Sequence, residues 1–156
     1  MSSVIHHPDI DLPMNHEASL QQLMIFFETL SPATCADLGK IYTEDAYFKD
    51  PFNEVQGITA ISHLFEHMFV QVDNPRFEVK STVLQGEQAF LCWDFLFNMK
   101  RFNTTPQCIQ GATHIRFADD GRVCMHRDYW DAAEELYEKL PVLGSFMRFL
   151  KRAARQ

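Results

Sequence analysis

The hydrophobic pattern of this sequence changes its period near residue 75, and this change constrains the fold more than any other feature. Before that point, apolar residues recur at every third or fourth position, which is typical of amphipathic helices. After it come four β-rich runs that are separated by turn residues and cover 76–84, 88–101, 107–117 and 122–130. Consecutive strands with short connections pair antiparallel. The pattern therefore predicts an α+β fold with a curved antiparallel sheet.

The first half of the chain supplies the helices that cover this sheet. Apolar spacing predicts helices over residues 16–30, 34–42 and 58–69. A strand is expected over 46–50, where Pro51 ends it. A further helix is expected after Trp130, so that the element order is α-α-β-α-β-β-β-β-α. This order predicts helices packed on one concave face of a strongly bent, cone-shaped sheet.

Length and composition predict one domain of 156 residues, without disulfides. We expect a flexible arm over 1–15, the domain over 16–140 and a basic amphipathic helix over 141–156. The sequence contains no apolar run of membrane-spanning length and shows no signal peptide, and its four cysteines have no C-x-x-C spacing. These features favour a cytoplasmic protein with reduced thiols.

Charge argues against a nucleic-acid partner. The formal net charge is −7, and it becomes −11 when the four cations of the last nine residues are set aside. A body this acidic repels phosphate backbones. The cationic end of the chain is expected to pack on the protein, and membrane contact by this short helix is not expected.

Three segments resemble known families. Residues 42–51 (YTEDAYFKDP) and 57–61 (GITAI) resemble ketosteroid isomerase, and 126–131 (HRDYWD) resembles limonene epoxide hydrolase. With the predicted element order, the chain resembles the SnoaL-like branch of the nuclear-transport-factor-2-like superfamily over residues 17–138. The resemblance implies a cone fold with an internal pocket. Proteins with this fold include isomerases, cyclases, hydrolases, dehydratases and non-catalytic binders, so the fold does not settle the function.

The resemblance also implies roles for individual residues. The general base of the isomerase corresponds to Asp50, and its two oxyanion donors correspond to Phe26 and Thr113. Because a phenylalanine side chain cannot donate a hydrogen bond, steroid-type isomerisation is not expected. Of the central Asp–Arg–Asp set of the epoxide hydrolase, only Asp128 is present, and Asp94 and Leu96 replace the other two.

Strand alternation and the resemblance together predict which side chains face the pocket. Asp50 is the expected base, the Asp128–His126 pair the acid or orienting group, and Asp94 a carboxylate that tunes them. The expected substrate-binding residues are Phe26, Phe48, Leu96, Thr113 and Trp130.

Two functions from different classes remain open. The first is an enzyme that applies acid–base chemistry to a small, largely apolar molecule without a metal or other cofactor. The second is a non-catalytic small-ligand-binding or accessory protein. The H-x-x-E-H spacing of His63 to His67 matches some zinc peptidases, but helical geometry directs both histidines away from the core. A homodimer is expected through the convex sheet face, where alternation places Trp93, Phe95 and Phe97.

Overall fold

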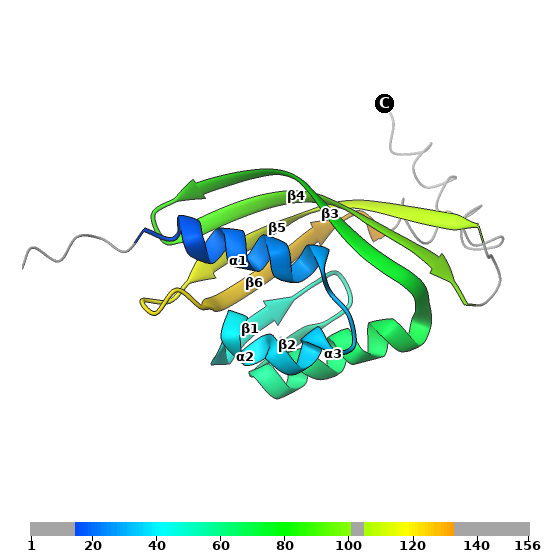
Figure 1. Ribbon diagram of the computed structural model, residues 1–156, viewed down its shortest axis with the longest axis horizontal. Helices are drawn as coiled ribbons and strands as arrows, with labels where there is room; N and C mark the ends of the chain where they lie inside the picture. Colours follow the sequence, from blue (N-terminus) through cyan, green and yellow to red (C-terminus); the bar gives the residue numbers. More distant parts are fainter. Residues whose placement is uncertain (1–14, 101–104, 133–156) are drawn as a thin grey trace, which may run out of the picture.

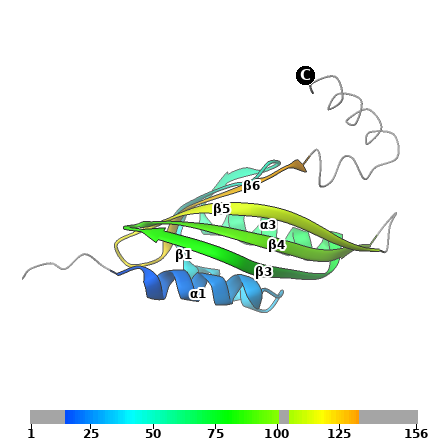
Figure 2. The ribbon, with the colours of Figure 1, turned by 90° about the horizontal axis from the view of Figure 1, so that it is seen from above.

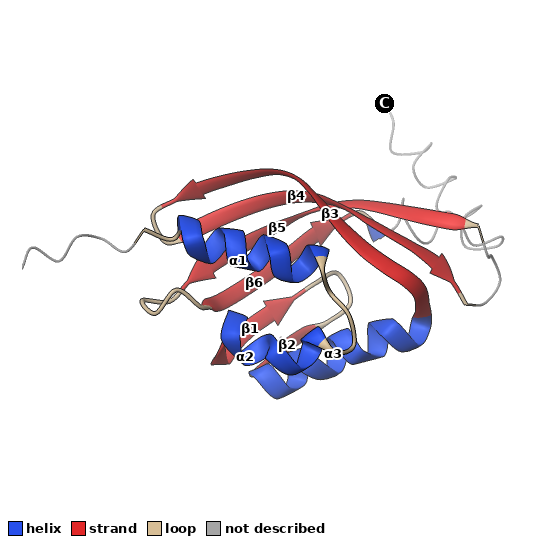
Figure 3. Cartoon of the chain, viewed as in Figure 1, coloured by secondary structure: helices blue, strands red, loops and turns tan. Residues whose placement is uncertain are grey.

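A six-stranded sheet in the order β2-β1-β6-β5-β4-β3 organises the protein (Figures 1 and 3). This computed structural model describes residues 15–100 and 105–132. The predicted C-terminal helix and residues 1–14 of the predicted arm lie outside the described residues. The helical elements are α1 (Glu17–Glu28), η1 (Thr34–Asp37), α2 (Leu38–Ile41) and α3 (Ile58–Gln71). The strands are β1 (Tyr42–Lys49), β2 (Glu54–Gln56), β3 (Val72–Gln85), β4 (Gln88–Met99), β5 (Pro106–Phe117) and β6 (Val123–Trp130).

The sheet is mixed and not antiparallel throughout, which corrects the sequence-based prediction. Strands β3 to β6 pair antiparallel as predicted. Strand β1 instead runs parallel to β6, with Phe48 opposite His126. A parallel pair requires a long connection, and here everything from β2 to β5 lies between the two strands in the chain. The sequence analysis also missed β2, a three-residue strand that pairs antiparallel with the end of β1.

Bulges in β3 bend the sheet. The register between β3 and β4 shifts twice, once between Asp73 and Arg76 and once between Val79 and Ser81. An extra residue in one strand increases its local twist and turns it away from its partner. Asn74, inside the first bulge, has a φ of 51°, a left-handed conformation that asparagine tolerates better than most residues. The bend gives the sheet the concave side on which the helices pack.

Helices α1 and α3 pack on the concave side because their apolar faces match it. Helix α1 directs Leu20, Leu23 and Phe26 into the core and lies beside β3 (Figure 2). Helix α3 buries Ile61 and Phe65. Burial of each such side chain stabilises the fold by about 1.5–3 kcal/mol. No helix in the described part of the chain is both long and apolar enough to cross a membrane.

Candidate functional site

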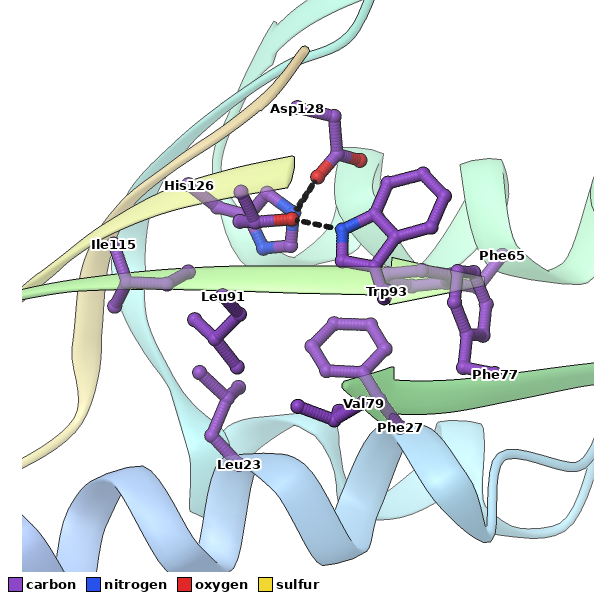
Figure 4. Close-up of a pocket in the computed structure, with 11 residues that line it drawn as sticks. Leu23, Phe27, Phe65, Phe77, Val79, Leu91, Trp93, Ile115, His126 and Asp128 are labelled. Atoms are coloured by element: carbon purple, nitrogen blue, oxygen red, sulfur yellow. Dashed lines mark hydrogen bonds and ion pairs between the residues drawn. The ribbon is translucent and has the colours of Figure 1, made fainter. Parts of the chain in front are cut away.

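A cavity lies between the concave face of the sheet and helices α1 and α3 (Figure 4). It contains about 420 Å³ of space that protein atoms do not fill, part of which opens to solvent. Apolar side chains make up most of its wall, and its polar atoms come from one end, where β4, β5 and β6 lie side by side. The lining residues are Leu23, Phe27, Phe65, Phe77, Val79, Leu91, Trp93, Thr113, Ile115, His126 and Asp128.

Strand register brings the polar residues together. Thr113 on β5 lies opposite Leu91 on β4 and Asp128 on β6, so these three side chains share one face of the sheet. His126 lies two residues before Asp128 on β6 and therefore points to the same face. The same register places His126 opposite Phe48 of β1.

Two hydrogen-bond chains converge on one oxygen of Asp128. In the first, the Trp93 indole Nε1–H donates to Oγ1 of Thr113 over 2.7 Å, and the Thr113 hydroxyl donates to Oδ1 of Asp128. An indole nitrogen can only donate, so the Thr113 hydroxyl accepts from it and keeps its own proton for Asp128. The direction of this chain is thereby fixed.

The second chain runs from Tyr42 through His126. The Tyr42 hydroxyl lies 2.7 Å from Nδ1 of His126, and Nε2 of His126 lies 2.8 Å from Oδ1 of Asp128. Tyr42 is fully buried, and burial together with the charge of Asp128 raises the pKa of its phenol well above 10. The phenol therefore keeps its proton. With the phenol assigned as the donor to Nδ1, Nε2 of His126 is the nitrogen that donates to Asp128.

Aromatic rings hold the His126 imidazole in place. Its ring centroid lies 4.7 Å from that of Phe48, 5.6 Å from that of Phe27 and 6.0 Å from that of Tyr42. Its exposed fraction is 2%. Packing of this density restricts the ring to one orientation, so that Nε2 stays directed at Asp128.

The other oxygen of Asp128 remains open. The side chain keeps 17% of its surface exposed, and Oδ2 has no hydrogen-bond partner among the described residues. Figure 4 shows the carboxylate at the edge of the cavity, with its second oxygen turned away from His126. Because Thr113 and His126 bind Oδ1, the carboxylate is fixed in direction while Oδ2 is free to accept a proton or a hydrogen bond.

The structure brings together some of the predicted site residues. Thr113, His126 and Asp128 line the cavity as predicted, and Phe48 packs on His126 from the neighbouring strand. Asp50 and Asp94, which were expected to face the same cavity as His126 and Asp128, lie elsewhere: Asp50 shares an adjoining hollow with Asp128, and Asp94 is on the other face of the sheet. Neither residue belongs to the cavity lining.

Asp94 lies on the opposite face of the sheet. It forms an ion pair with Lys80 over 3.2 Å and accepts a hydrogen bond from Gln110 over 3.3 Å. The side chains of β4 that face the cavity side are those at odd positions, where Trp93 and Phe97 are 8% and 7% exposed. Leu96, opposite Cys108, shares the outer face with Asp94. The predicted facing of β4 is therefore reversed.

This reversal also removes the surface proposed for a dimer. Trp93, Phe95 and Phe97 lie on the concave side of the sheet, where Phe77 stacks on Phe95 at 4.4 Å between ring centroids. They cannot form an apolar patch on the convex face. A homodimer stays a prediction, but this observation no longer supports it.

Asp50 closes a turn at the end of β1. Its Oδ1 accepts hydrogen bonds from the backbone N–H groups of Phe52 and Asn53 over 2.7 and 2.6 Å, and the Asn53 side chain binds both of its oxygens. An aspartate that binds the backbone two and three residues ahead stabilises a turn. Asp50 lines an open hollow beside β6, and Asp128 and Trp130 line the same hollow.

The remaining predicted residue, Phe26, is in the core and outside the cavity lining. It is 7% exposed, and its neighbour Phe27 is the α1 aromatic that reaches the cavity. Sequence reasoning missed Phe27, Phe77, Trp93 and Tyr42. For Trp93 a signal existed: the odd positions of β4, Ala89 to Phe97, are all apolar, whereas the even positions include Asp94 and Asn98.

The described residues contain no group of three or more His, Cys, Asp or Glu side chains suited to a metal ion. His63 and His67 of the H-x-x-E-H segment are exposed on α3, as predicted. His63 lies 3.4 Å from Glu66, and His67 bonds to Gln71. Their partners are thus on their own helix.

The fold and the cavity define a cone-shaped α+β protein of the nuclear-transport-factor-2-like type. A family model of the SnoaL-like domain matches residues 25–126, and the chain belongs to this family. No protein of curated function matches the sequence.

Solved structures share this fold at low sequence identity. A protein with a ketosteroid isomerase-like fold from Catenulispora acidiphila, in complex with trimethylamine, is 16% identical with a TM-score of 0.66, over 77% of this chain and 90% of its own. A protein named as a putative SnoaL-like polyketide cyclase from Jannaschia is 13% identical with a TM-score of 0.65, and the match covers 74% of this chain and 87% of its own. An LEH-like epoxide hydrolase from M. tuberculosis is 12% identical with a TM-score of 0.61, and the match covers 77% of this chain and 85% of its own.

Proposed function

We propose that the protein binds a small, largely apolar molecule in the cavity and moves a proton on it, with Asp128 as the general base. The observation that carries this proposal is the convergence of both hydrogen-bond chains on Oδ1, which leaves Oδ2 open at the edge of an apolar cavity. A positioned base contributes about 10²–10⁴-fold to the rate of a proton transfer. The named activities of relatives, polyketide cyclase and epoxide hydrolase, are reactions on small organic molecules.

His126 and Thr113 are positioning residues in this proposal. Both bind the oxygen that does not react, so they orient the carboxylate. The Tyr42 hydroxyl holds His126 in the tautomer that donates to Asp128. Loss of the Thr113 or the His126 donor is expected to change the orientation of the Asp128 carboxylate. Asp128 is still expected to be the base.

Hydrogen exchange at carbon tests the proposal without knowledge of the full reaction. Hydroxy-ketones and enones are incubated with the protein in D₂O, exchange of their acidic C–H protons is followed by NMR, and epoxides are screened for ring opening. We expect Asp128→Asn to abolish any activity found and Asp50→Asn to keep it. Activity that survives Asp128→Asn excludes Asp128 as the base.

A non-catalytic binding protein is the second candidate, and one observation favours it. Every donor of the polar chains, from the Trp93 indole to the Tyr42 phenol, is bound within the protein. Among the described lining residues, no free N–H or O–H is left for an oxyanion, which acyl and enolate chemistry generally requires. Saturable binding without exchange or turnover for every ligand found supports this second candidate.

A further inference from the structure

The open polar atoms of the cavity decide what kind of ligand it accepts. The indole N–H, the hydroxyl of Thr113 and Nε2–H of His126 are all used within the protein, and Oδ2 of Asp128 is left without a partner among the described residues. The polar end of the cavity therefore offers an acceptor and no donor. A ligand that satisfies it carries a donor or a positive charge.

Aromatic rings make up much of the remaining wall. Four of them, Phe27, Phe65, Phe77 and Trp93, line the cavity. They contact one another, with centroids 5.9 Å apart for Phe27 and Phe65, 5.7 Å for Phe27 and Phe77, and 5.5 Å for Phe77 and Trp93. The face of an aromatic ring is the negative part of its quadrupole and attracts a cation within about 6 Å. The side chains of Asp128, Trp93 and Phe27 converge on this one cavity (Figure 4).

No Lys or Arg among the described lining residues pairs with the carboxylate. Its Oδ1 binds the Thr113 hydroxyl and Nε2 of His126, and Oδ2 binds neither group. Arg127, the next residue along β6, lies over the Tyr129 ring on the opposite face. A half-buried carboxylate without a Lys or Arg partner is stabilised by a cationic ligand. The net charge of −7 also attracts cations from a distance.

We infer that the cavity selects a small organic cation, an amine that is protonated or quaternary and carries apolar substituents. The charged nitrogen lies between Oδ2 of Asp128 and the aromatic rings, and the apolar substituent extends toward Leu23 and Val79. This inference rests on the proposed site and names its ligand class. It also suits the proposed reaction, because a positive charge beside a C–H bond lowers the pKa of that bond and eases transfer of its proton to a carboxylate.

Three probes of nearly equal size and different charge test the inference. Binding of benzylamine (protonated at pH 7), benzyl alcohol and benzoate to the full-length protein is measured by calorimetry. We expect the amine to bind at least tenfold more tightly than the alcohol, and benzoate not to bind. If the alcohol binds as tightly as the amine, the inference is wrong while the proposed cavity stands. If none of the three binds, the inference and the proposed ligand site are both wrong.

Two variants assign the selectivity to the site. Asn at 128 keeps an acceptor for Thr113 and His126 but removes the charge, so we expect Asp128→Asn to bring the amine within about threefold of the alcohol. The matched control is Asp94→Asn, which removes one negative charge from the other face of the same sheet. We expect this control to keep the tenfold preference. An equal loss of preference in both variants overturns the inference, because it assigns the preference to the overall charge.

A third variant keeps the inference testable if Asp128→Asn does not fold. Phe77→Leu replaces one aromatic wall with an apolar side chain that has no quadrupole. We expect amine affinity to fall severalfold while alcohol affinity changes less than twofold. A parallel loss for both probes indicates altered cavity shape and contradicts a role for the rings in cation binding.

Discussion

Gly111 on β5 lies directly opposite Trp93 on β4, and the Trp93 indole occupies the space where any other residue would place its Cβ. A Cβ at position 111 would lie 2.4 Å from Cη2 of the ring. The glycine lets the indole lie flat across β5 and place its N–H on Thr113, two residues further along the same face. The first hydrogen-bond chain therefore depends on the absence of a side chain at position 111.

Gly111→Ala is expected to destabilise the protein by about 1–3 kcal/mol, because the methyl group and the rigid indole cannot occupy the same space. Urea unfolding measures the change in the free energy of unfolding. The same substitution in a Trp93→Leu background serves as the control, since leucine leaves the space open. An equal cost in both backgrounds would show that the clash is not with Trp93.

Tyr42→Phe removes the hydroxyl that donates to His126 and leaves Nδ1 buried without a partner. We expect a loss of about 1–3 kcal/mol in the free energy of unfolding. Tyr129→Phe, at a 47% exposed tyrosine, is the matched control and should change stability by less than about 0.5 kcal/mol. Nitrogen NMR on the native protein should show His126 neutral and protonated on Nε2. A proton on Nδ1 would contradict the direction of the second chain.

Stability at alkaline pH should depend on Tyr42. Its pKa in the folded protein is raised well above the ordinary value of 10 by burial and by Asp128, whereas the unfolded chain ionises near 10. The stability that the neutral phenol contributes is present below about pH 10 and is lost as the pH rises toward the folded pKa. The expected slope is about 1.4 kcal/mol per pH unit.

Unfolding midpoints between pH 9 and 11 measure this effect. The wild type and Tyr129→Phe should lose stability in parallel above pH 10, and Tyr42→Phe should lose less. Identical slopes in all three proteins would mean that Tyr42 ionises as easily in the folded state as in the unfolded chain.

Asp50→Ala should affect stability and leave function intact. The substitution removes the acceptor of two backbone N–H groups at the end of β1, which costs about 1 kcal/mol. Asp119→Ala, in the exposed turn before β6, is the comparison and should have little effect. Ligand binding and any turnover of the folded Asp50→Ala protein should match the wild type. A folded variant that has lost turnover would restore Asp50 as a candidate base.

The sequence predicted the class of fold and most element boundaries because periodicity reports which face of an element is buried. The strands over 107–117 and 122–130 were placed within one residue of the observed β5 and β6. The parallel pairing of β1 with β6 was not predictable in this way, because it joins segments about 80 residues apart through tertiary packing. The short strand β2 has too few residues to show a period.

The sequence predicted which side chains of β5 and β6 face the cavity, but it reversed the facing of β4. On β6, strand alternation correctly places His126 and Asp128 in the cavity. Trp130, on the same face of the strand, is not part of the cavity lining and packs beside Phe52, with 5.3 Å between the ring centroids. On β4, the family resemblance predicts Asp94 inside the cavity. The apolar side chains at odd positions favoured the opposite facing, and the structure follows them. The contact of Tyr42 with His126 could not be predicted from the sequence, because it depends on β1 lying beside β6.

The wall and the polar end of the cavity come from different parts of the chain. Helices α1 and α3 and strand β3 supply most of the apolar surface, whereas the groups that fix Asp128 belong to β1, β4, β5 and β6. Substitutions at Leu23 or Val79 therefore reshape the space for a ligand without breaking a hydrogen bond to the carboxylate. A protein built in this way can change the shape of its cavity by small steps in α1 and β3 while the hydrogen bonds of the carboxylate stay as they are.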